Sequence, residues 1–174
     1  MTIRVLVADD QAMIRGALAG LLDLERDIEV VAQAADGVQA LEELARLATK
    51  DTQSAQPPTN SARPDSPADV AIVDIEMPHM DGITTTEAIR ARFPGVRVLI
   101  VTTFGRPGYL QRALDAGATG FMVKNAPVEA LAEGVRTLAA GGRAIDQSLA
   151  VEALSAGSSS LTQREADVLR EVER

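Results

Sequence analysis

Four apolar segments of this 174-residue chain are each followed at once by a residue able to do chemistry. The residues are Asp9 and Asp10, then Asp74, Thr102 and Lys124. Clustered carboxylates repel one another, and they become tolerable when a hard cation with oxygen ligands lies between them. The types present therefore predict a site for a phosphoryl group together with Mg²⁺, the cation expected for such a ligand set.

Each of these residues has a distinct part in phosphoryl chemistry. The carboxylate of Asp74 can attack phosphorus in line and form an acyl phosphate. Lys124 offers a positive charge to one phosphoryl oxygen, and the hydroxyl of Thr102 can donate a hydrogen bond to another. Such a hydrogen bond would draw the end of its strand inward. The set therefore predicts a switch whose input is phosphorylation.

Taken singly, the same residues have simpler interpretations. Asp10 can cap a helix, and Asp9 can bind backbone amides in a turn. Lys124 alone can be a solvated side chain and Thr102 an ordinary strand residue. His79, the single histidine, is interpreted as a solvated loop residue without a role. The joint placement of the other residues favours the phosphoryl site.

These residues need a scaffold in which the ends of several strands meet. Five short apolar runs are typical of buried strands: Val5–Ala8, Ile28–Val31, Val70–Val73, Val98–Val101 and Phe121–Val123. Segments with helical spacing lie between them; the clearest stripe is Ile14, Ala17, Leu18, Leu21 and Leu22, and Gly117 closes the fourth helix. Strict alternation of strands and helices predicts a doubly wound α/β domain with a parallel sheet covered on both faces. Ligands of such sheets bind beyond the carboxyl ends of the strands, where the polar residues stand.

The remaining segments differ in composition from this alternating part. We divide the chain into a main domain (1–147), a linker (148–160) and a final helix (161–174). Residues 49–67 are rich in Pro, Ser, Thr and Asn, which predicts a flexible insertion between the second helix and the third strand. Thr162 and Glu165 form a capping box at the start of the final helix, which has an apolar side. A second domain is expected to begin there.

Composition excludes several classes of function. The chain has no cysteine and one histidine, which excludes disulfides and thiolate or histidine metal clusters, so any metal must use oxygen ligands. The formal charge of -8 argues against a grip on nucleic acid by these residues. No apolar run approaches the roughly 20 residues that span a bilayer. We expect a cytoplasmic protein without a membrane segment.

Four sequence motifs carry a resemblance to a known family. VLVADDQAMIR, VAIVDIEMPHMDG, VLIVTTF and GFMVKNAP resemble the response-regulator receiver domain, in order and at the expected strand ends. The tail LTQREADVLREV resembles the first helix of a LuxR-type helix-turn-helix domain, and together with TTFGRPGY it points to NarL/FixJ-type regulators. The resemblance implies the flavodoxin-like receiver fold, a five-stranded sheet of order 2-1-3-4-5 with five helices. It also implies that the chain stops within a DNA-binding domain.

The resemblance assigns roles to individual residues. It makes Asp74 the phosphoacceptor, Asp9 and Asp10 members of the acidic Mg²⁺ pocket, the backbone carbonyl of Glu76 a third protein ligand, and Thr102 and Lys124 the signalling pair. Phe121 stands at the family's aromatic switch position, although a plain core aromatic is the simpler alternative. Glu76 and Phe104 lie two positions after Asp74 and Thr102, and Phe104 is expected to shield the phosphoryl group and slow self-dephosphorylation.

The resemblance also implies partners. A sensor histidine kinase would donate the phosphoryl group, and phosphorylation would favour a homodimer through the first and fifth helices. DNA would be bound only by the full-length protein, because a first helix without a recognition helix cannot enter a major groove. No enzymatic activity is expected beyond self-phosphorylation and self-dephosphorylation.

Other functions remain open at this stage. A haloacid-dehalogenase-type phosphatase also uses an Asp nucleophile and Mg²⁺, but its D-x-D motif follows the first strand, where this chain reads ADDQA. A flavodoxin-like FMN carrier needs a phosphate loop there, and Asp9 and Asp10 would repel that phosphate. A receiver-like interaction module that works without phosphorylation is a closer alternative, and the complete set of site residues argues against it.

Overall fold

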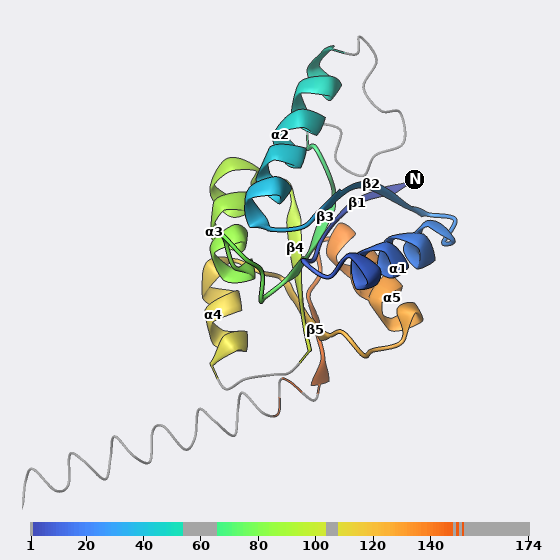
Figure 1. Cartoon of the computed structure of the whole chain (residues 1–174). Coiled ribbons are helices and arrows are strands. Elements are labelled where there is room, and N and C mark those ends of the chain that lie inside the picture. The colour runs from blue at the N-terminus through green and yellow to red at the C-terminus, as the bar shows by residue number, and fades with distance from the viewer. Residues whose placement is uncertain (1, 54–65, 104–107, 148, 150, 152–174) are drawn as a thin grey trace, which may run out of the picture.

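The computed structural model describes residues 2–53, 66–103, 108–147, 149 and 151. Within them, parallel strands form one sheet in the order β2-β1-β3-β4-β5-β6 (Figure 1). The strands are β1 (Ile3–Ala8), β2 (Ile28–Ala34), β3 (Val70–Asp74), β4 (Arg97–Thr102), β5 (Gly120–Val123) and β6 (Ala144–Ile145). The helices are α1 (Ala12–Asp23), α2 (Gly37–Gln53), α3 (Gly82–Arg92), α4 (Tyr109–Ala116) and α5 (Val128–Ala139).

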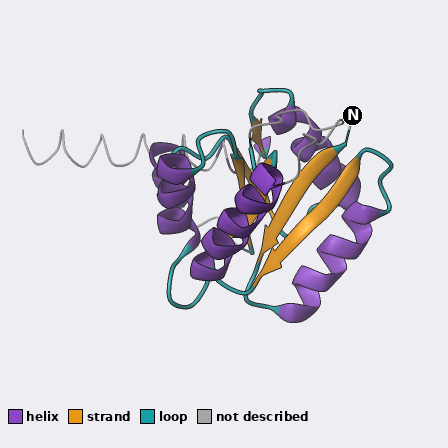
Figure 2. Ribbon diagram, turned by 90° about the horizontal axis from the view of Figure 1, so that it is seen from above, coloured by secondary structure: helices purple, strands orange, loops and turns teal. Residues whose placement is uncertain are grey.

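Helices cover both faces of the sheet (Figure 2). On one face, Leu22 of α1 and Val135 of α5 pack in a cluster with strand side chains. On the other face, Leu44 of α2, Ile89 of α3 and Ala113 of α4 belong to a second cluster. The central strand β3 is buried along its whole length, because both of its faces meet helices. This explains why its sequence is continuously apolar up to Asp74.

The predicted doubly wound receiver fold and its strand order are confirmed, with one addition. A short parallel strand, β6, extends the sheet beyond β5. The amide of Ala144 donates to the carbonyl of Thr119 at 3.1 Å, and the amide of Asp146 donates to the carbonyl of Phe121 at 3.0 Å. The prediction of five strands missed β6 because two residues after a glycine pair are too short to show a strand pattern.

The predicted insertion at 49–67 begins too early. Helix α2 continues to Gln53, so residues 49–53 are helical. Once the buried stripe of a helix has nucleated it, each added residue gains a hydrogen bond, and polar residues extend it readily. At the other end, Ser66 is buried and its hydroxyl donates to the carbonyl of Ala68 at 2.7 Å. Residues 54–65 lie outside the described residues.

The C-terminal predictions are mostly not covered by the structure. Of the predicted linker 148–160 only Leu149 and Val151 are described; Leu149 is buried and Val151 is exposed. The final helix predicted at 161–174 lies outside the described residues and stays a prediction. No helix in the described part of the chain is long and apolar enough to cross a membrane.

Candidate functional site

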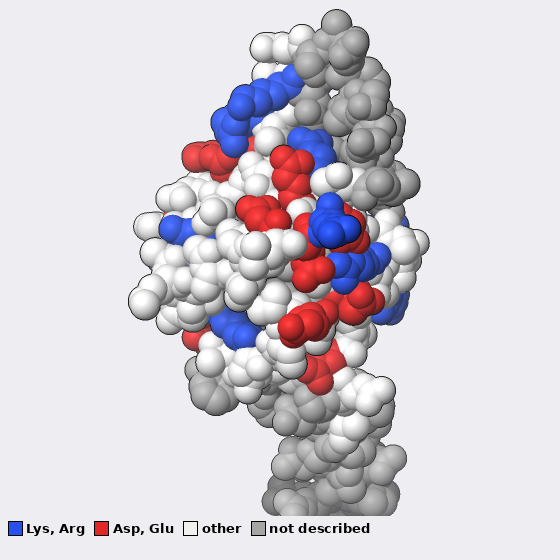
Figure 3. All heavy atoms as spheres, turned by 90° about the vertical axis from the view of Figure 1, so that its right-hand side faces the viewer, with Lys and Arg blue, Asp and Glu red and all other residues white. Residues whose placement is uncertain are grey.

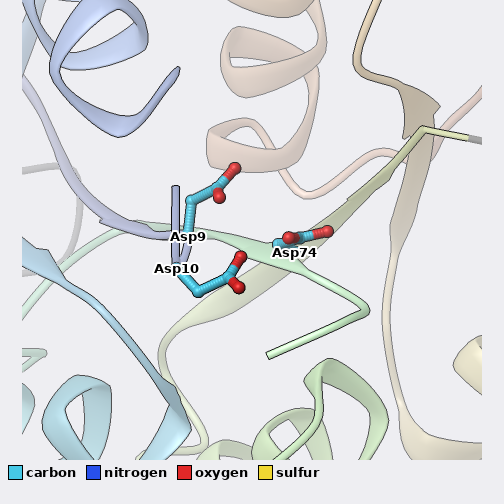
Figure 4. Close-up of side chains that lie close together, drawn as sticks. All are labelled: Asp9, Asp10 and Asp74. Carbon is cyan, nitrogen blue, oxygen red and sulfur yellow. The ribbon is translucent and has the colours of Figure 1, made fainter. Parts of the chain in front are cut away.

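The carboxyl ends of β1, β3, β4 and β5 bring the predicted chemical residues to one edge of the sheet. Asp9, Asp10 and Asp74 lie close together there (Figure 4). Each offers a carboxylate oxygen, and these oxygens all lie within 4.8 Å of one another. The three acids, together with Lys124, are called the acidic site below.

Asp9 is fixed by the turn between β1 and α1. Its carboxylate is buried, and Oδ1 accepts a hydrogen bond from the amide of Gln11 at 2.9 Å. Arg15 of α1 donates to the backbone carbonyl of Asp9 at 2.7 Å. The turn interpretation of Asp9 is therefore correct, but it leaves Oδ2 free to face the site. The capping interpretation of Asp10 is wrong, because Gln11 occupies the N-cap of α1.

Asp74 is held by a loop that packs directly onto the end of β3. The amide of Gly82, the first residue of α3, donates to the carbonyl of Ile75 at 2.8 Å. A Cβ atom at position 82 would lie 2.3 Å from the Asp74 carbonyl oxygen, so no other residue fits there without moving the backbone. Asp81 caps α3 by accepting from the amide of Thr84 at 2.8 Å. The glycine after Asp81 thus brings the loop close to Asp74.

Lys124 connects the strands electrostatically. Its ammonium nitrogen lies 3.0 Å from Oδ2 of Asp74 and 2.8 Å from Oδ2 of Asp9, and all three side chains are almost completely buried. The backbone amide of Lys124 donates to the carbonyl of Thr102 at 2.8 Å, which ties the ends of β4 and β5 together. One ammonium therefore faces three carboxylates, and the acidic site carries an excess of negative charge.

The pKa values of the paired groups follow from this crowding. Burial raises the pKa of the Asp74 carboxyl, the hydrogen bond and charge of Lys124 lower it only in part, and Asp9 and Asp10 add repulsion. Burial acts to lower the pKa of Lys124, but the close contacts with the Asp9 and Asp74 carboxylates and their charges outweigh it, and the net pKa is raised. Lys124 is therefore a stable cation, and ionised Asp74 lacks sufficient compensating charge.

An open pocket of about 330 Å³ is lined by most of the predicted site residues, while the buried Asp9 lies behind its lining. Its lining comprises Asp10, Asp74, Glu76, Thr102 and Lys124, together with Gln11 and Thr103. Sequence reasoning missed Gln11 and Thr103, although each stands one position after a residue that it singled out. The ligand role of the Glu76 carbonyl stays a prediction, and Phe104 lies outside the described residues.

Phe121 and His79 lie away from the pocket lining. The ring of Phe121 is fully buried in β5, on the face covered by α2, α3 and α4. Its switch role and its core interpretation are both compatible with this position. His79 is mostly exposed, as expected of a loop residue, but its Nδ1 lies 3.1 Å from Oδ2 of Asp36. His79 also has a positive φ of 68°, which is uncommon outside glycine.

The donor set fits a hard cation. Three carboxylates supply oxygen ligands, and their mutual distances within 4.8 Å are close to the distance of about 4.2 Å that separates opposite ligands at bonds of about 2.1 Å, so small side-chain shifts would bring them to a shared ion. Oδ2 of Asp9 is buried and receives no hydrogen bond of acceptable geometry from the described residues, although Lys124 lies close to it. A lone pair on this oxygen is therefore available to a ligand.

The fold and the acidic site together define a signal-receiver type of α/β domain, and comparisons with known proteins agree. Residues 5–136 match the family model of the response regulator receiver domain. The transcriptional regulatory protein DesR of Bacillus subtilis is 37% identical over 96% of this chain and 73% of its own length. YvfU of the same organism, an uncharacterized transcriptional regulatory protein, is 36% identical over 97% of this chain and 74% of its own length.

A solved structure gives the same result. The signal receiver domain of NarL from Mycobacterium tuberculosis is 30% identical and superposes with a TM-score of 0.66, covering 80% of this chain and 98% of that domain. The chain belongs to the response regulator receiver domain family, and its relatives are transcriptional regulators of the NarL type.

Proposed function

We propose that this chain is a phosphorylation switch in which Asp74 accepts a phosphoryl group from a sensor histidine kinase. The observation that carries the proposal is the shared lysine: Lys124 lies within 3.0 Å of Asp74 and within 2.8 Å of Asp9, while Asp10 completes the acidic cluster. A nucleophilic carboxylate, oxygen ligands for a cation and a fixed positive charge thus occur in one open pocket.

The proposed reaction exchanges one bond to phosphorus for another. An Oδ atom of Asp74 forms the new P–O bond as the P–N bond to the kinase imidazole breaks, and the imidazole leaves with the bonding pair. Asp9, Asp10, Asp74 and the Glu76 carbonyl would hold Mg²⁺, which when bound neutralises charge on the phosphoryl oxygens. Lys124 holds a further oxygen by its charge. The raised pKa of Lys124 keeps that charge in place.

The proposed readout begins at Thr102. This side chain is buried at the end of β4 and lines the pocket, so its hydroxyl is placed to donate to a phosphoryl oxygen. Movement of Thr102 would be accompanied by a rearrangement of the Phe121 side chain. Phe121 lies on β5 and pairs with Ile100 of the neighbouring strand β4. The switched arrangement would control transcription through a DNA-binding part in the full-length protein.

Mass spectrometry of the intact chain tests the reaction. We expect incubation with acetyl phosphate and Mg²⁺ to add the mass of one phosphoryl group, and a chelator of Mg²⁺ to prevent the addition. A chain that stays unmodified would instead support the second candidate, an interaction module that works without phosphorylation. Incorporation that is equally fast without the cation would contradict the metal role.

We further propose that phosphorylation favours a homodimer through α1 and α5. Helix α1 and its C-cap residue Leu24 carry an exposed stripe of apolar and small residues: Met13, Gly16, Ala17, Gly20, Leu21 and Leu24. Of the residues whose spacing predicted this helix, Ala17 and Leu21 are exposed to solvent. Figure 3 shows an uncharged area beside a mixed patch of acids and bases on the side that faces right in Figure 1. Such an exposed apolar stripe is typical of an interaction surface.

Position 20 allows a clean test of this surface. A Cβ added to Gly20 meets nothing within 4 Å, so Gly20→Arg leaves the fold of the protomer intact and places a charge on the stripe. Sedimentation with beryllofluoride, a phosphoryl mimic, should show a dimer for the wild type and for Ala91→Arg at an exposed position of α3, but a monomer for Gly20→Arg. A dimer that persists in Gly20→Arg would exclude this face.

A further inference from the structure

The chain that follows α5 runs along the outer edge of β5 and then returns to the core. Ala144 and Asp146 donate amide hydrogens to the carbonyls of Thr119 and Phe121, at 3.1 and 3.0 Å. Three residues later, Leu149 is buried and belongs to the same packed cluster as Phe121. We call Ala144, Ile145, Asp146 and Leu149 the strap.

The strap is connected to the acidic site through a very short path. Strand β5 comprises only Gly120–Val123, and Lys124 follows it directly. The Phe121 carbonyl that accepts from the strap is therefore three residues from the lysine that contacts Asp74 and Asp9. Strand β5 is therefore the most direct covalent path between Lys124 and the strap.

The strap also contacts the helix layer beside β5. The cluster that contains Leu149 and Phe121 includes Leu110 and Ala113 of α4, and Ile145 packs against it. On the opposite face, a groove of about 410 Å³ separates part of the strap from α5; Ala130, Gly134 and Ile145 are among its lining residues. Ala144 still packs against the α5 cluster beside this groove, but β6 has only two residues and open space borders part of it, so the strap can open locally at a lower cost than the central strands.

We propose that the strap reports the occupancy of the acidic site, so that an anion bound beside Asp74 strengthens the pairing of β6 with β5 and the seating of Leu149. A phosphoryl group adds negative charge next to Lys124 and holds its ammonium more firmly than two carboxylates alone. The carboxyl end of β5 then loses mobility. The hydrogen bonds from the amides of Ala144 and Asp146 consequently break less often. This inference rests on the proposed function.

Coupling between two sites is reciprocal, which supplies a second consequence. If an anion at Asp74 stabilises the strap, a firmly seated strap must increase the affinity for the anion by the same factor. The strap thereby connects the acidic site to the chain after Val151, without requiring any other element to move.

Hydrogen exchange on the wild-type chain tests the proposal without a substitution. With Mg²⁺ and beryllofluoride, the amides of Ala144 and Asp146 should exchange at least about fivefold more slowly than with Mg²⁺ alone, the lower end of common coupling energies. Unchanged exchange rates in a chain that binds the mimic would overturn the proposal about the strap and leave the proposed phosphoryl site unaffected. Failure to bind the mimic at all would overturn both.

A substitution measures the reciprocal effect. Leu149→Ala removes the buried anchor, and calorimetry should show an affinity for beryllofluoride reduced at least about fivefold. Val151→Ala, at an exposed neighbouring position, is the matched control and should bind as the wild type does. Equal affinity of the two variants would contradict the proposal. If Leu149→Ala does not fold, the exchange measurement on the wild type decides alone.

Discussion

Two clusters in this molecule have the same composition, three carboxylates and one basic side chain, yet they behave oppositely. In the acidic site, Lys124 serves Asp9 and Asp74 while Asp10 completes the group. In the second, here called the Arg136 cluster, the guanidinium of Arg136 pairs with Glu25 at 2.6 Å, Asp27 at 2.8 Å and Glu133 at 2.8 Å. The Arg136 cluster joins α5 to the turn between α1 and β2.

The difference lies in burial and in the shape of the base. The Arg136 side chain is 30% exposed, and its planar fork donates a separate hydrogen bond to each acid. Its hydrogen bonds lower the pKa of Asp27, and the pKa of Arg136 itself is raised. In the acidic site, burial instead raises the pKa of Asp74. Both clusters carry the same excess of negative charge, but water screens it in the exposed Arg136 cluster and cannot do so in the buried acidic site.

Removing the basic side chain of each cluster should show the difference between the two clusters most clearly. Without Mg²⁺, Lys124→Met leaves buried carboxylates without a partner and should lower the free energy of unfolding by about 3 kcal/mol, as for other broken buried pairs. Arg136→Met should cost about 1 kcal/mol or less, because water screens the exposed acids. Urea unfolding of both variants measures this, and equal losses would contradict the contrast.

Adding Mg²⁺ should stabilise one cluster only. At a concentration about 100 times the dissociation constant, a bound ion adds about 2.7 kcal/mol to the free energy of unfolding. We expect a rise in the thermal midpoint of the wild type and of Glu133→Gln, and a much smaller rise in Asp10→Asn. A rise of the same size in Asp10→Asn would remove that residue from the metal site.

The smallest effect concerns acid stability. Because the pKa of Asp27 is lowered in the folded chain, its ionised form stabilises the fold above the ordinary carboxyl pKa of 3.8, and this contribution is lost as the pH falls through the lowered pKa. Between about pH 6 and pH 3, the free energy of unfolding of Asp27→Asn should therefore fall by about 0.5 kcal/mol less than that of the wild type. Asp36, whose pKa is also lowered, is present in both proteins and cancels in the difference. Parallel pH profiles would show that the pair of Asp27 with Arg136 adds no stability.

The comparison also shows what sequence can reveal. Asp74 and Lys124 were predictable because each directly follows a continuously apolar strand, and the parallel sheet places all such positions at one edge. The Arg136 cluster was not predictable, since Arg136 and Asp27 lie 109 positions apart and charged surface residues carry no periodic signal. The strap escaped notice for a related reason, because β6 is defined by its pairing with β5 and not by its own residues.

Intact-mass measurement of phosphoryl incorporation into three chains tests the central claim most directly. With acetyl phosphate and Mg²⁺, the wild type and Asp27→Asn should each gain one phosphoryl group, because the Arg136 cluster takes no part in the reaction. Asp74→Asn should gain none. Undiminished incorporation into Asp74→Asn would contradict the account, and loss of incorporation in Asp27→Asn would show that the two clusters are not independent.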